Sequence, residues 1–276
     1  MDETALARIK IVLVRPLGAL NVGSVARVMK NMGVSQLVLV EPQCDPLGEE
    51  ARKMALHALD VLEAARIVES IPEALTGCQR AIATSARSRH LSVIPENPRT
   101  ALPWLFGADS SALIFGPEDK GLSNEDLKYA QRFVQIPSSP VYPSLNLAQA
   151  VAVCCYELYQ NCLENQGVVE TYLEEKTTED TTASLDALER YYQQLESLLL
   201  KIGYLYPHTA ESRMVKFRLL FNRAQPSANE VAMLKGIISQ MEWALGRGAG
   251  EQGSRGAGEQ GNSSLTPNPY PLPPNP

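Results

Sequence analysis

The chain has 276 residues, a formal net charge of −6 and an apolar content of 45%, which suit a globular protein with one ordinary domain and a smaller one. The acidic balance gives no general sign of a nucleic-acid binder. No apolar run approaches the roughly 20 residues that span a bilayer, and the first ten residues, MDETALARIK, lack the apolar core of a secretory signal. We expect a cytoplasmic protein with no membrane partner.

The first 163 residues alternate short apolar runs with helical patterns. The runs that predict strands are continuously apolar and do not alternate with polar residues. They cover residues 9–14, 36–40, 81–84, 112–115 and 133–136. Continuous runs separated by helices favour a mostly parallel sheet that is covered on both faces. The sequence therefore predicts an α/β domain over residues 1–163.

Helices are predicted between these strands, with local signals at several ends. Their ranges are residues 22–32, 49–56, 72–75, 98–105, 123–130 and 146–163. Gly33 ends the first of them, and Ser123 with Asp126 forms a capping box at the start of the fifth. Asn146 is a suitable N-cap for the sixth.

The predicted helix over residues 146–163 is apolar on almost every side in its first three turns. Gln149 is the one polar exception there. A helix without a polar face has to be covered on both sides. One cover is the core of its own chain, and we expect a second subunit to supply the other.

The five cysteines are odd in number and have no metal-ligand spacing. They are Cys44, Cys78, Cys154, Cys155 and Cys162. Three of them lie on the predicted helix over residues 146–163, which is typical of small core residues in a reduced protein. We expect no metal site.

Three regions follow the α/β domain. Residues 164–183 carry six acids against one base and predict an acidic linker. Residues 184–245 predict a small domain of three helices. The second, at about residues 211–223, holds a basic cluster, and Ser227 with Glu230 forms a capping box at the start of the third. Residues 246–276 repeat RGAGEQG and then become proline-rich, a composition that predicts a disordered tail.

Three loops at predicted strand ends are rich in small and special residues, where open α/β sheets bind ligands. They begin the stretches 18–33, 115–127 and 136–158. Two of them show the glycine spacing of a phosphate-binding P-loop, but the lysine of that motif is replaced by Ser24 and Leu122. No G-x-G-x-x-G follows a strand, so a dinucleotide fold has no support either.

Four motifs occur in a recognisable order: NVGSVAR at 21–27, TSAR at 84–87, FGPE with GLSN at 115–124, and SLNL at 144–147. Together they resemble the SpoU/TrmH-type RNA 2′-O-ribose methyltransferases of the SPOUT superfamily. The resemblance covers residues 8–163. It continues through ERYYQQLESLLLKIGY and FRLLFNRAQPSANEVAMLKGI, which are similar to the extension of members that methylate cytidine and uridine in tRNA.

The resemblance implies a deep trefoil knot in the carboxyl-terminal part of the α/β domain, an exception to the rule against knots. It also implies an S-adenosylmethionine pocket in the knot and an obligate homodimer that completes each active site. Glycine and proline loops suit such a ligand because they hold the backbone in unusual conformations close to it. The expected cofactor-binding residues are Thr84, Ser85, Ala86, Gly116, Gly121, Ile136, Pro143, Ser144 and Leu145.

Arg27 matches the arginine that the family places beside the reacting ribose. A guanidinium is a poor base, so a clamp on the substrate phosphate is the favoured role, and proton acceptance after perturbation by that phosphate stays open. Four polar residues are expected to orient Arg27 or the hydroxyl: Asn21, Glu118, Ser144 and Asn146. Glu118 has the alternative role of only fixing its loop.

One position departs from the family pattern, because Pro143 stands where relatives usually have serine. The loss removes a hydroxyl, whereas backbone contacts to the donor can persist. The three histidines match no motif, and we expect no histidine-based catalysis.

The resemblance implies methylation of a cytidine or uridine ribose in tRNA, at position 32 of the anticodon loop. The residues expected to contact tRNA phosphates are Arg213, Lys216, Arg218 and Arg223. Two alternatives remain at this point: a ribosomal RNA substrate, and a non-catalytic RNA-binding dimer of the same fold. We expect no DNA partner.

Overall fold

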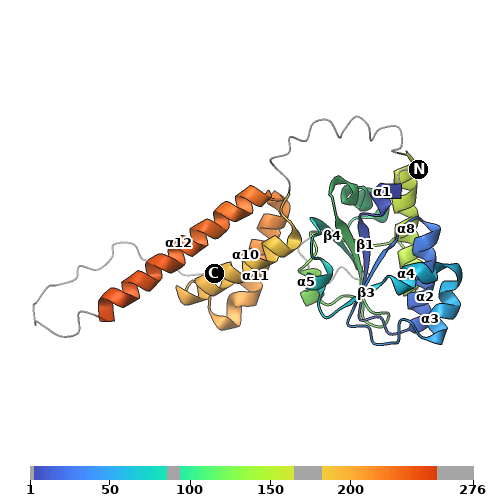
Figure 1. Cartoon of the computed structure of the whole chain (residues 1–276), viewed down its shortest axis with the longest axis horizontal. Coiled ribbons are helices and arrows are strands. Elements are labelled where there is room, and N and C mark those ends of the chain that lie inside the picture. The colour runs from blue at the N-terminus through green and yellow to red at the C-terminus, as the bar shows by residue number, and fades with distance from the viewer. Residues whose placement is uncertain (1–2, 86–93, 165–181, 254–276) are drawn as a thin grey trace, which may run out of the picture. The chain divides into compact units, whose positions relative to one another are not determined.

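The computed structural model describes residues 3–85, 94–164 and 182–253 (Figure 1). The chain divides into two compact units, residues 1–235 and residues 236–276. Within the described residues, no helix is long and apolar enough to cross a membrane.

A six-stranded parallel sheet forms the centre of the first unit, with the strand order β3-β2-β1-β5-β4-β6. The strands are β1 (Ile9–Val14), β2 (Gln36–Val40), β3 (Arg66–Val68), β4 (Arg80–Thr84), β5 (Ser111–Phe115) and β6 (Arg132–Val134). Every residue of β1 and β5 is buried, as expected for central strands that helices cover on both faces. The predicted parallel α/β sheet is confirmed.

Successive residues of β1 point into two separate cores. Ile9, Ile11 and Leu13 pack in one core, whereas Val12 and Val14 pack in the other. This alternation is the period of two that a strand imposes on its side chains. The sheet is therefore the middle layer of three.

Helices cover the two faces unequally, as Figure 1 shows for α5 and for the group α2, α3, α4 and α8 on the opposite side. The larger core includes residues of α1 (Glu3–Leu6), α2 (Ala19–Asn31), α3 (Glu49–Ala55), α4 (Leu59–Glu63), α6 (Pro98–Ala101) and α8 (Leu147–Glu164). The smaller core is covered by α5 (Ile71–Ala74) and α7 (Asn124–Leu127). The buried side of α8 carries Val151, Cys154, Cys155 and Leu158.

Sequence patterns missed or misjudged three elements of this domain. Strand β3 escaped notice because it has three residues and exposes Arg66 and Ile67 at the sheet edge. Helix α4 is a short piece that follows the 3₁₀ turn η1 (Leu56–Ala58). The helix predicted over residues 98–105 is wrong in its second half, where the chain forms the 3₁₀ helix η2 (Leu102–Gly107). Pro103 has no N–H to donate to an α-helical ladder, which explains the change.

Three helices form the extension: α10 (Leu185–Lys201), α11 (Pro207–Ala224) and α12 (Ala228–Gly253). Helix α11 begins four residues before the predicted start, with Pro207 at a position where a missing N–H costs nothing. Ser227 and Glu230 form the capping box that was predicted before α12.

Helix α12 continues to Gly253, past the predicted end of the extension at residue 245. Each glycine costs a helix about 1 kcal/mol relative to alanine, but only a proline would deny the backbone its hydrogen bonds. The sequence has no proline between Pro226 and Pro267. The rest of the predicted tail, residues 254–276, and linker residues 165–181 lie outside the described part of the chain.

Candidate functional site

A cavity of about 520 Å³ lies where β4, β5 and β6 end, at the carboxyl edge of the sheet. This volume falls in the range of sites that hold small organic ligands, about 300–1,000 Å³. Eight of the nine residues expected to bind a cofactor line it: Thr84, Ser85, Gly116, Gly121, Ile136, Pro143, Ser144 and Leu145. The ninth, Ala86, lies outside the described residues.

The loop after β5 folds back on itself to form one wall of the cavity. A Cβ atom added to Gly116 would lie 2.3 Å from the Leu122 nitrogen and 2.4 Å from the Gly121 carbonyl carbon. Gly121 itself has a φ of 69°, a left-handed conformation that other residues rarely adopt. The wall therefore has no room for a side chain at Gly116, whereas a side chain at Gly121 would meet no atom and would only strain the backbone.

The neighbouring wall is fixed by bonds between strand ends. The Ser85 amide donates to the Val134 carbonyl at 2.9 Å, and the Thr84 hydroxyl donates to the Ile114 carbonyl at 3.1 Å. Loops held in this way present main-chain groups at fixed positions. The ionisable side chains along the described lining are Glu118, Asp119 and Lys120.

Glu118 is the centre of a polar network beside the cavity. One carboxylate oxygen accepts hydrogen bonds from the Gly18 amide at 3.1 Å and from Asn21 Nδ2 at 2.7 Å. The other oxygen accepts one from the Leu17 amide at 2.9 Å. Glu118 therefore holds the start of α2 against the loop after β5.

Two asparagines extend this network to α8. Asn146 Nδ2 donates to Asn21 Oδ1 at 3.0 Å, and the Ala148 amide donates to Asn146 Oδ1 at 2.9 Å. Asn146 is thus the predicted N-cap of α8 and also a link to α2. Three loops that are far apart in the sequence meet in one chain of hydrogen bonds, and Ser144 lies beside it on the cavity wall.

Sequence reasoning missed a second connection at this edge. Arg15, which follows β1 with a φ of 48°, forms an ion pair with Asp126 at 2.5 Å and another with Glu41 at 3.5 Å. Asp126 also completes the capping box with Ser123 at the start of α7. The pair holds α7 next to the cavity, and no local pattern around Arg15 reveals it.

Arg27 lies apart from the cavity of its own chain. It is exposed on α2, six residues and roughly 9 Å along the helix from Asn21, and it does not line the cavity. No ion pair or hydrogen bond involves its side chain within the described residues. The structure therefore leaves this guanidinium accessible to a second molecule.

Cys44 and Cys155 are poorly suited to act as nucleophiles. Partial burial, followed by the charges of Glu118 and Asp45, raises the pKa of the Cys44 thiol. Burial raises the pKa of Cys155 to about 12. Both thiols stay protonated at neutral pH. The described residues contain no group of three or more side chains suited to hold a metal ion.

Helix α11 places the predicted RNA-binding residues on two different faces. At 100° per residue, Arg213, Lys216 and Arg223 fall within about 80° of its circumference. Lys216 and Arg223 are exposed and Arg213 is half-exposed. Arg218 points about 140° away from this arc. Three of the four residues therefore share one basic face.

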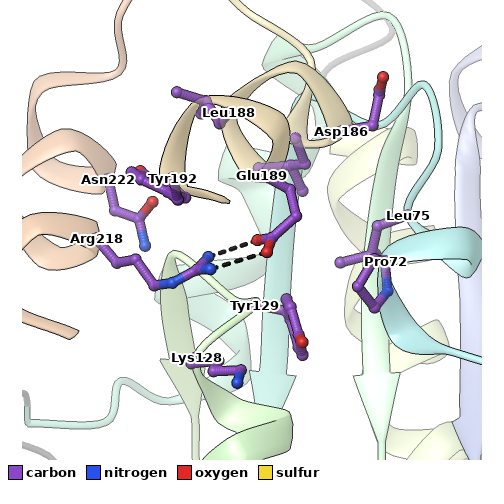
Figure 2. Close-up of a pocket in the computed structure, with 11 residues that line it drawn as sticks. Pro72, Leu75, Lys128, Tyr129, Asp186, Leu188, Glu189, Tyr192, Arg218 and Asn222 are labelled. Atoms are coloured by element: carbon purple, nitrogen blue, oxygen red, sulfur yellow. Dashed lines mark hydrogen bonds and ion pairs between the residues drawn. The ribbon is translucent and has the colours of Figure 1, made fainter. Parts of the chain in front are cut away.

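Arg218 is instead part of a buried contact between the extension and the α/β domain, shown in Figure 2. Its guanidinium donates two hydrogen bonds to the Glu189 carboxylate, at 2.6 and 2.9 Å, and the two side chains are only 12% and 15% exposed. The guanidinium also lies 4.5 Å from the Tyr192 ring and 5.8 Å from the Tyr129 ring. This geometry contradicts the expectation that Arg218 contacts phosphate.

Further bonds join the two parts of this contact. The Leu185 amide donates to the Cys78 carbonyl at 2.6 Å, and the Gly77 amide donates to Asp186 at 3.1 Å. Asn222 Nδ2 donates to the Ala130 carbonyl at 3.4 Å. Helices α10 and α11 are therefore attached to the α/β domain at several points.

Two family models match the chain. The SpoU rRNA methylase family matches residues 8–156, and the C-terminal domain of the tRNA methyltransferase TrmJ matches residues 186–253. The chain is 40% identical over 244 residues to the tRNA (cytidine/uridine/adenosine-2′-O-)-methyltransferase TrmJ of Pseudomonas aeruginosa, a match that covers 86% of this chain and 95% of the relative.

Two further comparisons agree. The tRNA (cytidine/uridine-2′-O-)-methyltransferase TrmJ of Escherichia coli K12 is 40% identical over 240 residues, which are 86% of this chain and 96% of that protein. The crystal structure of TrmJ from Z. mobilis ZM4 superimposes with a TM-score of 0.73 at 29% identity and covers 84% of this chain and 98% of that one. The similarity thus extends over both the sheet and the helical extension.

Proposed function

The chain belongs to the SpoU rRNA methylase family and carries the TrmJ C-terminal domain, and on this premise we propose that it methylates tRNA in the cytoplasm, at the ribose of a cytidine or uridine at position 32 of the anticodon loop. The reaction is an S-adenosylmethionine-dependent methyl transfer to the 2′-hydroxyl. The observation that carries the proposal is the cavity at the carboxyl edge of the sheet, which gathers the residues of three separate motifs.

The cavity fits S-adenosylmethionine in size and in charge. Bound there, the donor supplies an activated methyl group on a positively charged sulfur. The carboxylates of Glu118 and Asp119 on the cavity wall favour the positively charged sulfur. Lys120, which pairs with Asp119, carries the opposite charge. Gly116, Gly121 and the 143–145 segment provide main-chain groups that can hold the adenine and the amino-acid part.

Arg27 is the residue proposed to act on the RNA. A guanidinium keeps its proton at neutral pH, so it suits a two-point clamp on the phosphate beside the reacting ribose better than the role of a base. Such a clamp fixes the 2′-oxygen for in-line attack. Asn21, Ser144 and Asn146, whose positions are set by the Glu118 network, contribute polar groups for orienting the hydroxyl.

We propose that a homodimer completes the site, since Arg27 does not reach the cavity of its own chain. Exposed apolar side chains gather on α2, on α8, and on the segments before them: Leu17, Leu20, Val141, Tyr142, Val153 and Tyr156. Helices α2 and α8 pack against each other, so they offer one face to a second copy. An apolar face of this kind is typical of subunit interfaces.

We further propose that the segment between β6 and α8 is threaded as a trefoil knot. Strand β6 is at the edge of the sheet beside β4, yet α8 packs on α2. The chain between them runs along the cavity, next to the folded-back loop of Gly116 and Gly121.

The basic face of α11 is proposed to bind tRNA phosphates. Arg213, Lys216 and Arg223 form this face. The acidic residues lie in the linker before the extension, so the bases are concentrated on the extension itself. Contacts of this type make affinity fall steeply with salt concentration.

Methyl transfer from labelled S-adenosylmethionine to total RNA, followed by nucleoside mapping, tests the substrate. We expect label in 2′-O-methylcytidine or 2′-O-methyluridine of tRNA, at position 32 of the anticodon loop. Label confined to ribosomal RNA would contradict the tRNA assignment. An absence of label in any RNA would indicate the non-catalytic alternative.

Arg27→Ala is expected to lower methyl transfer by at least 100-fold, because the clamp that fixes the ribose is lost. Binding of S-adenosylhomocysteine, measured by calorimetry, should stay unchanged, since Arg27 does not line the cavity. Arg27→Lys is the matched control that keeps the charge but not the two-point geometry, and it should recover only part of the rate. Full activity of Arg27→Ala would exclude Arg27 from the reaction.

A further inference from the structure

The segment where α10 leads into α11, from the end of α10 at Lys201 to the first turn of α11 at His208, exposes three aromatic rings. Tyr204 is 53% exposed, Tyr206 is 55% exposed and His208 is also exposed, whereas Leu205 between the tyrosines is only 1% exposed. Leu205 anchors the segment in the helical core. The rings on either side of it therefore point to solvent.

The backbone of this segment is held firmly. The amides of Tyr204 and Leu205 both donate to the Leu199 carbonyl, at 2.9 and 3.0 Å, after a left-handed turn at Gly203. The amide of Ala210 then donates to the Tyr206 carbonyl at 2.9 Å and starts α11. The aromatic side chains are thus presented from a fixed frame, which lowers the entropy cost of binding a partner.

The rings are arranged for stacking and are accompanied by cations. The Tyr206 and His208 rings lie nearly parallel, with centroids 6.0 Å apart and planes at 23°. The Arg213 guanidinium lies 6.0 Å from the Tyr204 ring centroid and donates to the Tyr204 carbonyl at 3.4 Å. Lys201 is exposed at the end of α10. The rings of Tyr204, Tyr206 and His208 together form an aromatic platform.

We propose that the aromatic platform binds unpaired bases of the tRNA by stacking, while the adjoining basic face of α11 binds phosphates. This inference rests on the proposed function and assigns a second mode of contact to the extension. Aromatic rings next to arginine are the features with which proteins hold single-stranded RNA, since every base offers a flat face. Double-stranded RNA does not offer such faces, so the platform points to a loop of the tRNA.

A protein partner fits this surface less well. Arg213 contacts the Tyr204 ring, and exposed lysines occur at the end of α10 (Lys201) and on the same face of α11 as Arg213 (Lys216). The cores of protein interfaces are depleted of lysine. A polyanion, in contrast, gains from each of these charges.

The test compares two double variants. Tyr204→Leu with Tyr206→Leu keeps apolar area but removes both rings, whereas Tyr204→Phe with Tyr206→Phe keeps the rings and removes only the hydroxyls. The affinity of each for tRNA and for a short oligouridylate is measured by fluorescence anisotropy at two salt concentrations. Thermal unfolding and S-adenosylhomocysteine binding verify that the fold and the cavity are intact.

The leucine variant is expected to bind both RNAs about tenfold or more weakly than the wild type. The phenylalanine variant should bind within about twofold of the wild type, since the flat face is kept. The dependence of affinity on salt should not change in either variant, because no charge is removed. Lys216→Ala, by contrast, should make the slope of log affinity against log salt concentration shallower, by the amount that corresponds to about one phosphate contact.

Three results would overturn the inference. The first is equal RNA affinity of the leucine variant and the wild type. The second is an equal loss in the leucine and phenylalanine variants. The third is unchanged RNA affinity with a smaller species in sedimentation, which would make the platform a contact between protein chains. A wild type that binds oligouridylate through its rings but methylates no tRNA would refute the proposed function alone.

Discussion

At the scale of single residues, Glu118 has the position of a support for the site. Its carboxylate accepts hydrogen bonds from the amides of Leu17 and Gly18 and from Asn21, and it lines the cavity as well. These contacts favour the role of fixing the loop, which the sequence left as one of two alternatives. The same carboxylate sets the orientation of Asn21 and, through it, of Asn146.

Glu118→Ala should lower the free energy of unfolding by about 1–3 kcal/mol, because two amides and an amide side chain lose their acceptor. Glu118→Gln keeps an acceptor oxygen and should lose less. Chemical denaturation gives the stability of each variant, and calorimetry gives its affinity for S-adenosylhomocysteine. A catalytic carboxylate would behave differently: both variants would lose methyl transfer completely at unchanged stability.

Gly116→Ala is expected to abolish donor binding. The new methyl group would lie 2.3 Å from the Leu122 nitrogen, and backbone on that side cannot yield without opening the cavity wall. Gly121→Ala is the matched control, because its Cβ would meet nothing within 4 Å and the variant pays only the cost of a left-handed φ, about 1–2 kcal/mol. Calorimetry with S-adenosylhomocysteine should separate the two; equal affinities would contradict the steric argument.

At the scale of elements, helix α11 has two tasks on opposite sides. One side carries Arg213, Lys216 and Arg223 to solvent, and the other inserts Arg218 between Tyr192 and Tyr129. The five bases between Lys201 and Arg223 thus do not act as one cluster. A charge run on a helix has to be divided by face before a function is assigned to it.

Arg218→Ala should destabilise the chain by about 3–5 kcal/mol, because it leaves the Glu189 carboxylate buried without a partner. The double variant Arg218→Met with Glu189→Met removes both charges and should recover much of that loss. The midpoint of thermal unfolding reports the difference. A phosphate-binding arginine would give the opposite pattern, with unchanged unfolding and a weaker salt dependence of tRNA binding.

At the scale of the whole molecule, the cavity at the carboxyl edge of the sheet and the basic face of α11 lie in different parts of the chain. The cavity belongs to the sheet, whereas the basic face and the aromatic platform belong to the helices that follow the linker. Contacts such as those of Leu185 with Cys78 and of Asn222 with Ala130 attach α10 and α11 to the sheet domain. None of the described residues of these helices lines the cavity, so donor binding and tRNA affinity should be separable by truncation.

A chain that ends at residue 165 should bind S-adenosylhomocysteine with the affinity of the full protein. Its affinity for tRNA should fall by at least tenfold. The slope of log affinity against log salt concentration should become shallower by the amount that corresponds to about three phosphate contacts. Filter binding at several salt concentrations measures both quantities. Unchanged tRNA affinity would remove the extension from substrate recognition.

The sequence by itself determined the parts of this protein that depend on local chemistry. It located β1 and β2 to the residue, the capping boxes at Ser123 and Ser227, and the cavity-lining loops. Buried strands need continuous apolar runs, and bent loops need glycine or proline, so these features are written in neighbouring residues. Parallel strands bring their carboxyl ends to one edge, which is why the loops meet.

Only the tertiary structure decided which polar side chains face each other. Glu118 and Asn21 are 97 residues apart in the chain, and Arg15 and Asp126 are 111 apart. Arg218 changed from an expected phosphate contact to a buried partner of Glu189 for the same reason. A charged side chain is solvated or paired according to what packs around it, and that packing depends on residues that no local pattern connects.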